Sequence, residues 1–167
     1  MNLENTAMEL ATNGNARITI ANDGHVVLSN SIAFNNETAT ANRLDDYEEG
    51  SWTGVIATGG GTVSGEWYTK IGNIVFVTAT LSAWGDTTSS TAITVTGFPF
   101  TCSATGFGIC KFCKHSDAHK GPWIEVSGTT GTFLKSSTST GSCDYMYHSG
   151  IVQSSGSAAF SVWYNVA

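Results

Sequence analysis

Two runs of alternating side chains on either side of Gly72-Asn73 constrain the fold of this chain more than any other feature. Residues 67–71 alternate between two faces before this pair, and residues 74–81 do so after it. The second run carries four aliphatic side chains on one face: Val75, Val77, Ala79 and Leu81. Alternation with a period of two is typical of a strand with one buried face, and a two-residue turn containing Gly and Asn joins antiparallel strands. The sequence therefore predicts a β-hairpin over residues 67–81.

The same short period continues through the second half of the chain. Further runs span residues 52–56, 91–95, 105–111, 122–126, 132–134, 144–152 and 158–166. Many short strands separated by Gly, Ser and Thr turns favour an antiparallel β-sandwich, and a length of 167 residues leaves room for one sizeable domain plus an extension. We expect an all-β fold, a jelly-roll-like sandwich, whose strand order the pattern leaves open.

The N-terminal segment has a weaker β pattern. Residues 17–20 and 25–28 flank Asn22-Asp23-Gly24, a strong hairpin signal, and residues 1–14 are expected to be a polar tail. Isolated hairpins are marginally stable in water, so copies from several chains are expected to wrap together as a stalk. The alternative is that residues 15–35 add strands to the following domain. Six residues are candidates for the contacts between copies: Ile18, Ile20, Val26, Leu28, Phe34 and, from the last strand, Trp163.

Between these segments lies the acidic stretch 43–53, which reads Arg-Leu-Asp-Asp-Tyr-Glu-Glu-Gly-Ser-Trp-Thr. Tyr-Thr-Lys-Ile-Gly-Asn follows at 68–73 and Ile-Thr-Val-Thr-Gly-Phe-Pro-Phe at 93–100. Upstream, residues 17–24 read Arg-Ile-Thr-Ile-Ala-Asn-Asp-Gly. Over residues 15–100 this ordered series resembles the C-terminal β-module of tailed-phage and other viral fibre proteins.

The resemblance implies a non-enzymatic virion protein, either a short fibre or spike or a capsid-bound head fibre. Residues 1–42 would attach it to other virion proteins, residues 43–50 would form an acidic hinge, and residues 51–167 would form the head. The expected assembly is a homotrimer, and the head would bind a host-surface glycan or protein or decorate the particle. The start of the chain, Met1-Asn2-Leu3-Glu4, shows no secretory signal, so we expect synthesis in the host cytoplasm.

Charge and cysteine usage argue against several other functions. The net charge is −6 and no basic stripe is present, which argues against a nucleic-acid groove. No apolar run is long enough for a membrane helix. Four cysteines are better explained as free buried thiols than as disulfides in a chain of this length. We therefore expect neither nucleic acid nor membrane insertion.

One cysteine and histidine cluster suggests a metal site. Cys110, Cys113, His115 and His119 supply ligand types that zinc prefers. The two halves are separated by a single residue, and a strand over residues 107–113 would place the two cysteines on opposite faces. We expect no metal and no cofactor.

Catalytic motifs are missing as well. Neither a Gly-x-Ser-x-Gly elbow nor a phosphate loop occurs. Asp45, Asp46, Glu48 and Glu49 could be read as a glycosidase pair, but adjacent acids on a hinge are more often a solvated surface. We expect no enzyme activity, with a hydrolytic spike domain as the weaker alternative.

Two loops are candidates for ligand contact. Residues 82–90 and 114–123 each combine a tryptophan with polar groups, which is what a sugar needs: a flat apolar platform and hydrogen-bonding groups beside it. The candidate residues are Trp84, Asp86, Asp117, His119 and Trp123. The alternative for each ring is packing over the end of the sandwich, and a stand-alone carbohydrate-binding module is the competing function. Trp52 and Trp67 are expected to be buried or interfacial.

Overall fold

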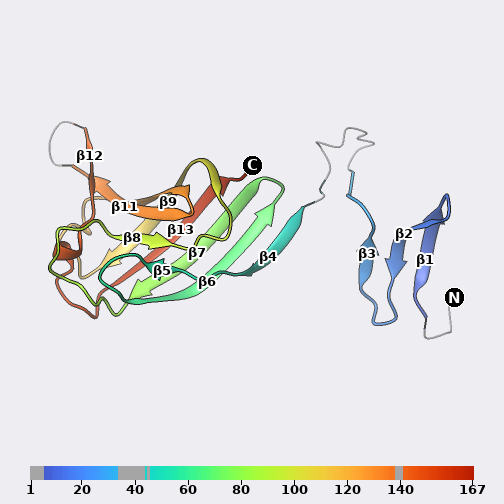
Figure 1. Cartoon of the computed structure of the whole chain (residues 1–167), viewed down its shortest axis with the longest axis horizontal. Coiled ribbons are helices and arrows are strands. Elements are labelled where there is room, and N and C mark those ends of the chain that lie inside the picture. The colour runs from blue at the N-terminus through green and yellow to red at the C-terminus, as the bar shows by residue number, and fades with distance from the viewer. Residues whose placement is uncertain (1–5, 34–43, 45, 138–140) are drawn as a thin grey trace. The chain divides into compact units, whose positions relative to one another are not determined.

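The structure is a computed structural model that describes residues 6–33, 44, 46–137 and 141–167. The chain divides into two compact units, Met1–Tyr47 and Glu48–Ala167 (Figure 1). The boundary falls inside the stretch predicted as an acidic hinge. Part of that stretch is a strand, however, because β4 spans Tyr47–Ser51 and belongs to the head sheet. Phe34, one of the predicted contact residues, lies outside the described residues.

Unit 1 contains a three-stranded antiparallel sheet of β1 (Met8–Thr12), β2 (Asn15–Ile20) and β3 (Val26–Leu28). The predicted hairpin is confirmed as β2–β3. The prediction of a tail over residues 1–14 missed β1, which is joined to β2 through Asn13 and Gly14, both with positive φ (54° and 74°). These angles fit the primed turns that tight hairpins prefer. The three strands form a sheet of their own, so the alternative that they extend the head domain is wrong for them.

Unit 2 is the head, and the predicted all-β antiparallel fold is confirmed there. Its strands are β4 (Tyr47–Ser51), β5 (Val55–Ile56), β6 (Thr62–Ile71), β7 (Ile74–Ser82), β8 (Thr94–Thr96), β9 (Cys102–Cys113), β10 (Trp123–Gly128), β11 (Thr130–Ser136), β12 (Cys143–Tyr145) and β13 (Ser157–Asn165). They form one sheet in the order β4-β6-β7-β13-β9-β10-β11-β8-β5, with β12 beside β11.

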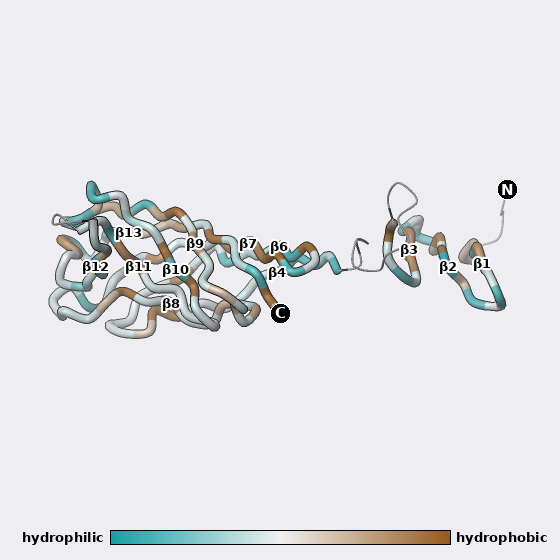
Figure 2. Tube along the Cα trace, turned by 90° about the horizontal axis from the view of Figure 1, so that it is seen from above, coloured by the Kyte–Doolittle hydropathy of each residue, from teal (hydrophilic) through white to brown (hydrophobic). Residues whose placement is uncertain are grey.

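The head sheet curls so that one face of nearly every strand lines a common core (Figure 1). The predicted β6–β7 hairpin is confirmed, with Ile71 opposite Ile74 and Gly72 at φ 57°. On β7 the inward residues are the four aliphatic side chains at 75, 77, 79 and 81, and on β13 they are Ala158, Phe160, Val162 and Tyr164. Figure 2 shows hydrophobic residues recurring along these central strands.

Two predicted strands are largely wrong. Of residues 52–56, only β5 (Val55–Ile56) is a strand. Residues 144–152 were expected to be extended, but only β12 (Cys143–Tyr145) is, and a 3-10 turn, η2, follows at His148–Gly150. Ser149 donates its backbone N–H to the Ser89 carbonyl and Ser116 donates to the Gly150 carbonyl. Hydrogen bonds to two other loops therefore replace the pairing that a strand would need here. Within the described part of the chain, no helix is long and apolar enough to cross a membrane.

Several long connections meet at one end of the head. Ser82, Cys113 and Ser157 lie at the same level of β7, β9 and β13, as their pairing shows. The segments that link β7 to β8, β9 to β10 and β12 to β13 therefore leave or enter the sheet at this end, which we call the loop end (Figure 1). Both loops predicted to bind a ligand belong to it.

Candidate functional site

Trp84 is a core residue of the loop end. Its side chain is 3% exposed, stacks on Phe112 with ring centroids 6.4 Å apart, and meets the edge of His148 at 6.0 Å. A glycine at 85 and a positive φ at Ala83 let the chain bend so that the ring folds inward. The prediction that Trp84 is an exposed sugar platform is therefore wrong, and the alternative, packing over the end of the sandwich, holds for this ring.

Asp86 builds the turn that follows Trp84. Its Oδ1 accepts backbone N–H groups from Thr88 at 2.8 Å and Ser89 at 3.1 Å, and its Oδ2 accepts the Ser89 hydroxyl at 2.5 Å. The Ser89 hydroxyl, followed by the Thr88 N–H, holds the pKa of Asp86 well below its usual range. A carboxylate occupied in this way closes a loop and has little capacity left for a ligand.

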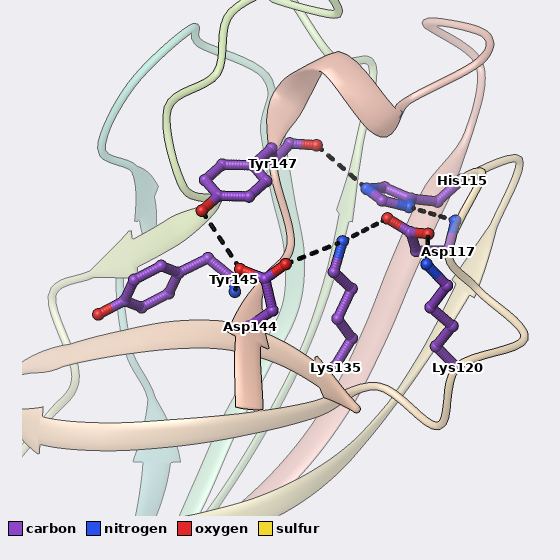
Figure 3. A network of polar contacts seen from close by, with 7 residues as sticks. All are labelled: His115, Asp117, Lys120, Lys135, Asp144, Tyr145 and Tyr147. Atoms are coloured by element: carbon purple, nitrogen blue, oxygen red, sulfur yellow. Dashed lines mark hydrogen bonds and ion pairs between the residues drawn. The ribbon is translucent and has the colours of Figure 1, made fainter. Parts of the chain in front are cut away.

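Asp117 is the centre of a polar network at the loop end (Figure 3). Lys120 contacts its Oδ1 at 2.7 Å and Lys135 contacts its Oδ2 at 2.5 Å. Hydrogen bonds from Lys120 and then from Lys135 lower the pKa of Asp117 to about 2. The Lys135 side chain is 9% exposed and also lies 3.8 Å from Asp144, which accepts the Tyr147 hydroxyl. All of these charges are paired, so the network joins strands and loops and offers no free group to a substrate.

His115 completes the network. Its Nδ1 accepts the Asp117 backbone N–H at 3.1 Å, so Nε2 carries the proton and donates to the Tyr147 carbonyl at 3.1 Å. Burial lowers the pKa of His115 below its ordinary value, which agrees with this neutral form. Both ring nitrogens are therefore occupied, and the residue is suited neither to general-base catalysis nor to holding a metal.

Replacing Asp117 by asparagine is expected to lower the free energy of unfolding by about 2 kcal/mol, because the buried Lys135 ammonium loses its closest counter-charge. Urea unfolding followed by fluorescence would measure the change. Asp144→Asn is the matched control: its carboxylate is half exposed and 3.8 Å from the same ammonium, so a loss below about 1 kcal/mol is expected. Equal losses in the two variants would contradict the central position of Asp117.

The remaining candidate ligand residues do not gather into one site. His119 is exposed in the loop beside Asp117. Trp123 begins β10, pairs with Ile109 of β9 and donates its indole N–H to Glu125 at 3.3 Å. Its ring therefore belongs to the outer face of the sheet. Of the five predicted residues, Trp84 and Asp86 share one loop and Asp117 and His119 share another. Trp84 is buried and Trp123 lies on β10, so neither loop forms the predicted combination of an exposed aromatic platform and polar groups.

The cysteine and histidine cluster is also dispersed. Cys110 lies on the inner side of β9, where burial raises the pKa of its thiol to about 12, and Cys113 lies on the outer side. The predicted opposite orientation is therefore confirmed. His115 is occupied as described above. Among the residues that the structure describes, no three His, Cys, Asp or Glu side chains are arranged to hold a metal ion.

The predicted contact residues of unit 1, in contrast, do come together. Pairing places Ile20 between Met8 and Val26, and Ile18 between Leu10 and Leu28. These two rows form one apolar face, which we call the N-terminal face: Met8, Leu10, Ile18, Ile20, Val26 and Leu28. None of the residues described in unit 1 is buried. Sequence reasoning missed Met8 and Leu10, although Met8-Glu9-Leu10 has the alternation that could have revealed them.

Trp163, the predicted contact residue of the head, is exposed on the outer face of β13. It lies opposite Phe76 of β7 on one side and Phe107 of β9 on the other. Trp67 was expected to be buried or interfacial. Its side chain is 64% exposed on β6, so it is not buried within the head. Trp52 is buried, as expected, and its indole N–H donates to the Thr78 carbonyl.

Comparison with known proteins identifies no relative. A scan against protein-family models, a search of curated proteins and a search of solved structures each found no match.

Proposed function

We propose that this protein is a non-enzymatic structural component of a virion, a short fibre or spike or a capsid-bound head fibre. The N-terminal segment assembles the chains into a homotrimer and attaches them to other virion proteins. The head, a jelly-roll-like sandwich, presents a β-surface that contacts a host-surface glycan or protein or decorates the particle. The resemblance of residues 15–100 to viral fibre modules supports the virion setting.

The N-terminal face is the observation that carries this proposal. A three-stranded sheet gains stability by burying one face, yet four of the six side chains of this face are 38% to 59% exposed. Apolar side chains in two rows across three strands would stabilise the sheet if other copies covered them. A fibre stalk requires a segment whose apolar side chains become buried only when several copies associate.

Features of the head fit this role better than the alternatives. The order β13-β9-β10-β11 follows the Greek-key pattern, in which a later strand returns beside the first of three neighbours, and this pattern is common in β-sandwiches. The buried position of Trp84 weighs against a sugar platform at the loop end and so against a stand-alone carbohydrate-binding module. The paired charges around Asp117 weigh against a hydrolytic site.

Two measurements test the assembly: the mass of the native protein and the effect of substitutions at two adjacent valines. Light scattering should give three times the chain mass of 17.5 kDa. Val26→Asp places a charge in the N-terminal face and should weaken association by at least about tenfold. Val27→Asp is the matched control, because Val27 is 46% exposed on the opposite face of the same strand. A folded monomer at micromolar concentration would refute the trimer.

The virion setting needs a separate measurement. Particles purified from infected cells should contain the chain at a stoichiometry that is a multiple of three, and an antibody against the head should label intact particles. A chain found only outside the particles would leave the trimer in place and remove the virion function.

A further inference from the structure

The outer face of the head carries a second apolar surface, which we call the belt. It crosses five neighbouring strands, β6, β7, β13, β9 and β10, and Trp163 on β13 lies between Phe76 on β7 and Phe107 on β9. Ile109, two residues along β9, pairs with Trp123 on β10. The strongly exposed members of the belt are Trp67, Ile71, Ile74, Phe76, Phe107, Ile109 and Trp163.

The belt is large enough for a stable protein interface. Its seven strongly exposed members are 44% to 70% exposed. With about 150–250 Å² for each aromatic side chain and somewhat less for isoleucine, these fractions amount to roughly 800 Å². That area is about one partner's share of a standard interface, and it exceeds the largest apolar patch of a typical monomer.

Strand β9 places its large apolar side chains on the outer face of the sheet and glycines on the inner face. Phe107 and Ile109 point to solvent, whereas the inward positions beside them are Gly106 and Gly108. A Cβ on Gly108 would lie 2.3 Å from the Ser161 carbonyl oxygen, so the inner side has no room for a side chain. The large apolar side chains of this segment can therefore be buried only by something outside the head.

The chemistry of the belt fits another protein surface. Strands β6, β7, β13, β9 and β10 place only two charged residues on this face, Lys111 and Glu125. Lys111 pairs with Ala159 of β13, away from Trp163 on that strand. Glu125 pairs with Phe107 and so lies at the end of the row formed by Phe76, Trp163 and Phe107. Aromatic enrichment with charges at the rim is typical of an interface core. A shallow groove of about 470 Å³, lined mainly by aromatic and aliphatic side chains of β9, β10 and β13, could receive a protruding side chain.

We propose that the belt packs against the belts of neighbouring copies of this chain, so that the heads of an oligomer are held together through β6, β7, β13, β9 and β10. The inference rests on the proposed function, since copies joined through their N-terminal faces hold their heads at a raised local concentration. At that concentration, belts that each supply one partner's share of a standard interface would associate even with modest intrinsic affinity.

Thiol accessibility in the full chain tests the proposal. Cys113→Ser and Cys143→Ser remove the two exposed thiols, and Ile109→Cys then places a probe at the most exposed position of the belt. In the assembled protein, a maleimide should label this thiol at least about tenfold more slowly than the thiol of Ser149→Cys, an exposed position at the loop end. Light scattering on the same samples reports whether the protein is assembled.

The outcomes separate the two proposals. An assembled protein in which the thiol introduced by Ile109→Cys reacts as fast as the control would overturn the belt contact and leave the trimer intact; the belt would then be free for a host ligand or another virion protein. A monomeric protein would overturn both. If Ile109→Cys disturbs assembly, hydroxyl-radical oxidation of the unaltered protein decides. Trp163 should be protected relative to His119, which is exposed at the loop end, when each is compared with its own oxidation in the unfolded protein.

Discussion

Trp84→Ala is expected to destabilise the head by about 3–5 kcal/mol, because it removes a buried indole and leaves a cavity at the loop end. The ring packs against Phe112 and His148, so its loss loosens the contact between β9 and the loop that contains η2. Chemical unfolding followed by tryptophan fluorescence or circular dichroism measures the change. A large loss of stability is what the buried position of Trp84 requires, whereas an exposed sugar platform could be removed at little cost.

Trp84→Phe is the matched control. The indole N–H of Trp84 has no hydrogen-bond partner among the described residues, so phenylalanine gives up no hydrogen bond to the protein and keeps most of the apolar volume. A loss of under about 2 kcal/mol is expected. Wild-type stability in Trp84→Ala would show that the ring does not lie in the core.

Gly108→Ala is expected to destabilise the head by about 3 kcal/mol or more, the upper end of the cost of overpacking. The new Cβ would lie 2.3 Å from the Ser161 carbonyl oxygen and 2.6 Å from the Val162 Cα. Backbone atoms of a paired strand cannot rotate away, so β9 and β13 would have to separate. Thermal unfolding would show a large drop in the melting temperature, or the protein would fail to fold.

Gly128→Ala provides the comparison for this substitution. No atom lies within 4 Å of a Cβ at Gly128, and only its positive φ of 59° opposes a side chain. The expected loss is about 1–2 kcal/mol, the cost of the left-handed conformation for a non-glycine residue. If Gly128→Ala were the more damaging of the two, the close approach of β9 and β13 would be refuted.

The N-terminal face and the belt differ in how burial against a partner would affect stability. The N-terminal face belongs to a sheet with no buried residue among those described, so burial against other copies would give this sheet the core that it lacks. The belt covers a head that already has its own core, and its burial would add to an existing fold. We therefore expect changes in the belt to affect assembly more than head folding, and changes in the N-terminal face to affect both the order of the stalk and assembly.

Local patterns determined much of the fold. The all-β class, the β2–β3 and β6–β7 hairpins and the strand character of β9, β10, β11 and β13 follow from alternation and from Gly and Asn in turns, which act between residues close in sequence. The grouping of Ile18, Ile20, Val26 and Leu28 on one face follows from the same period, once the hairpin register is known.

The tertiary structure decided where each surface lies. Alternation separates the two faces of β7 and β9 but does not say which face closes on the core, because both carry apolar side chains. Curling of the sheet placed Val75 and Gly108 on the inside, and so left Phe76 and Phe107 outside. In the same way, contacts with segments far away in sequence bury Trp84 and occupy the polar atoms of Asp117 and His115. Such contacts cannot be predicted from residue type alone.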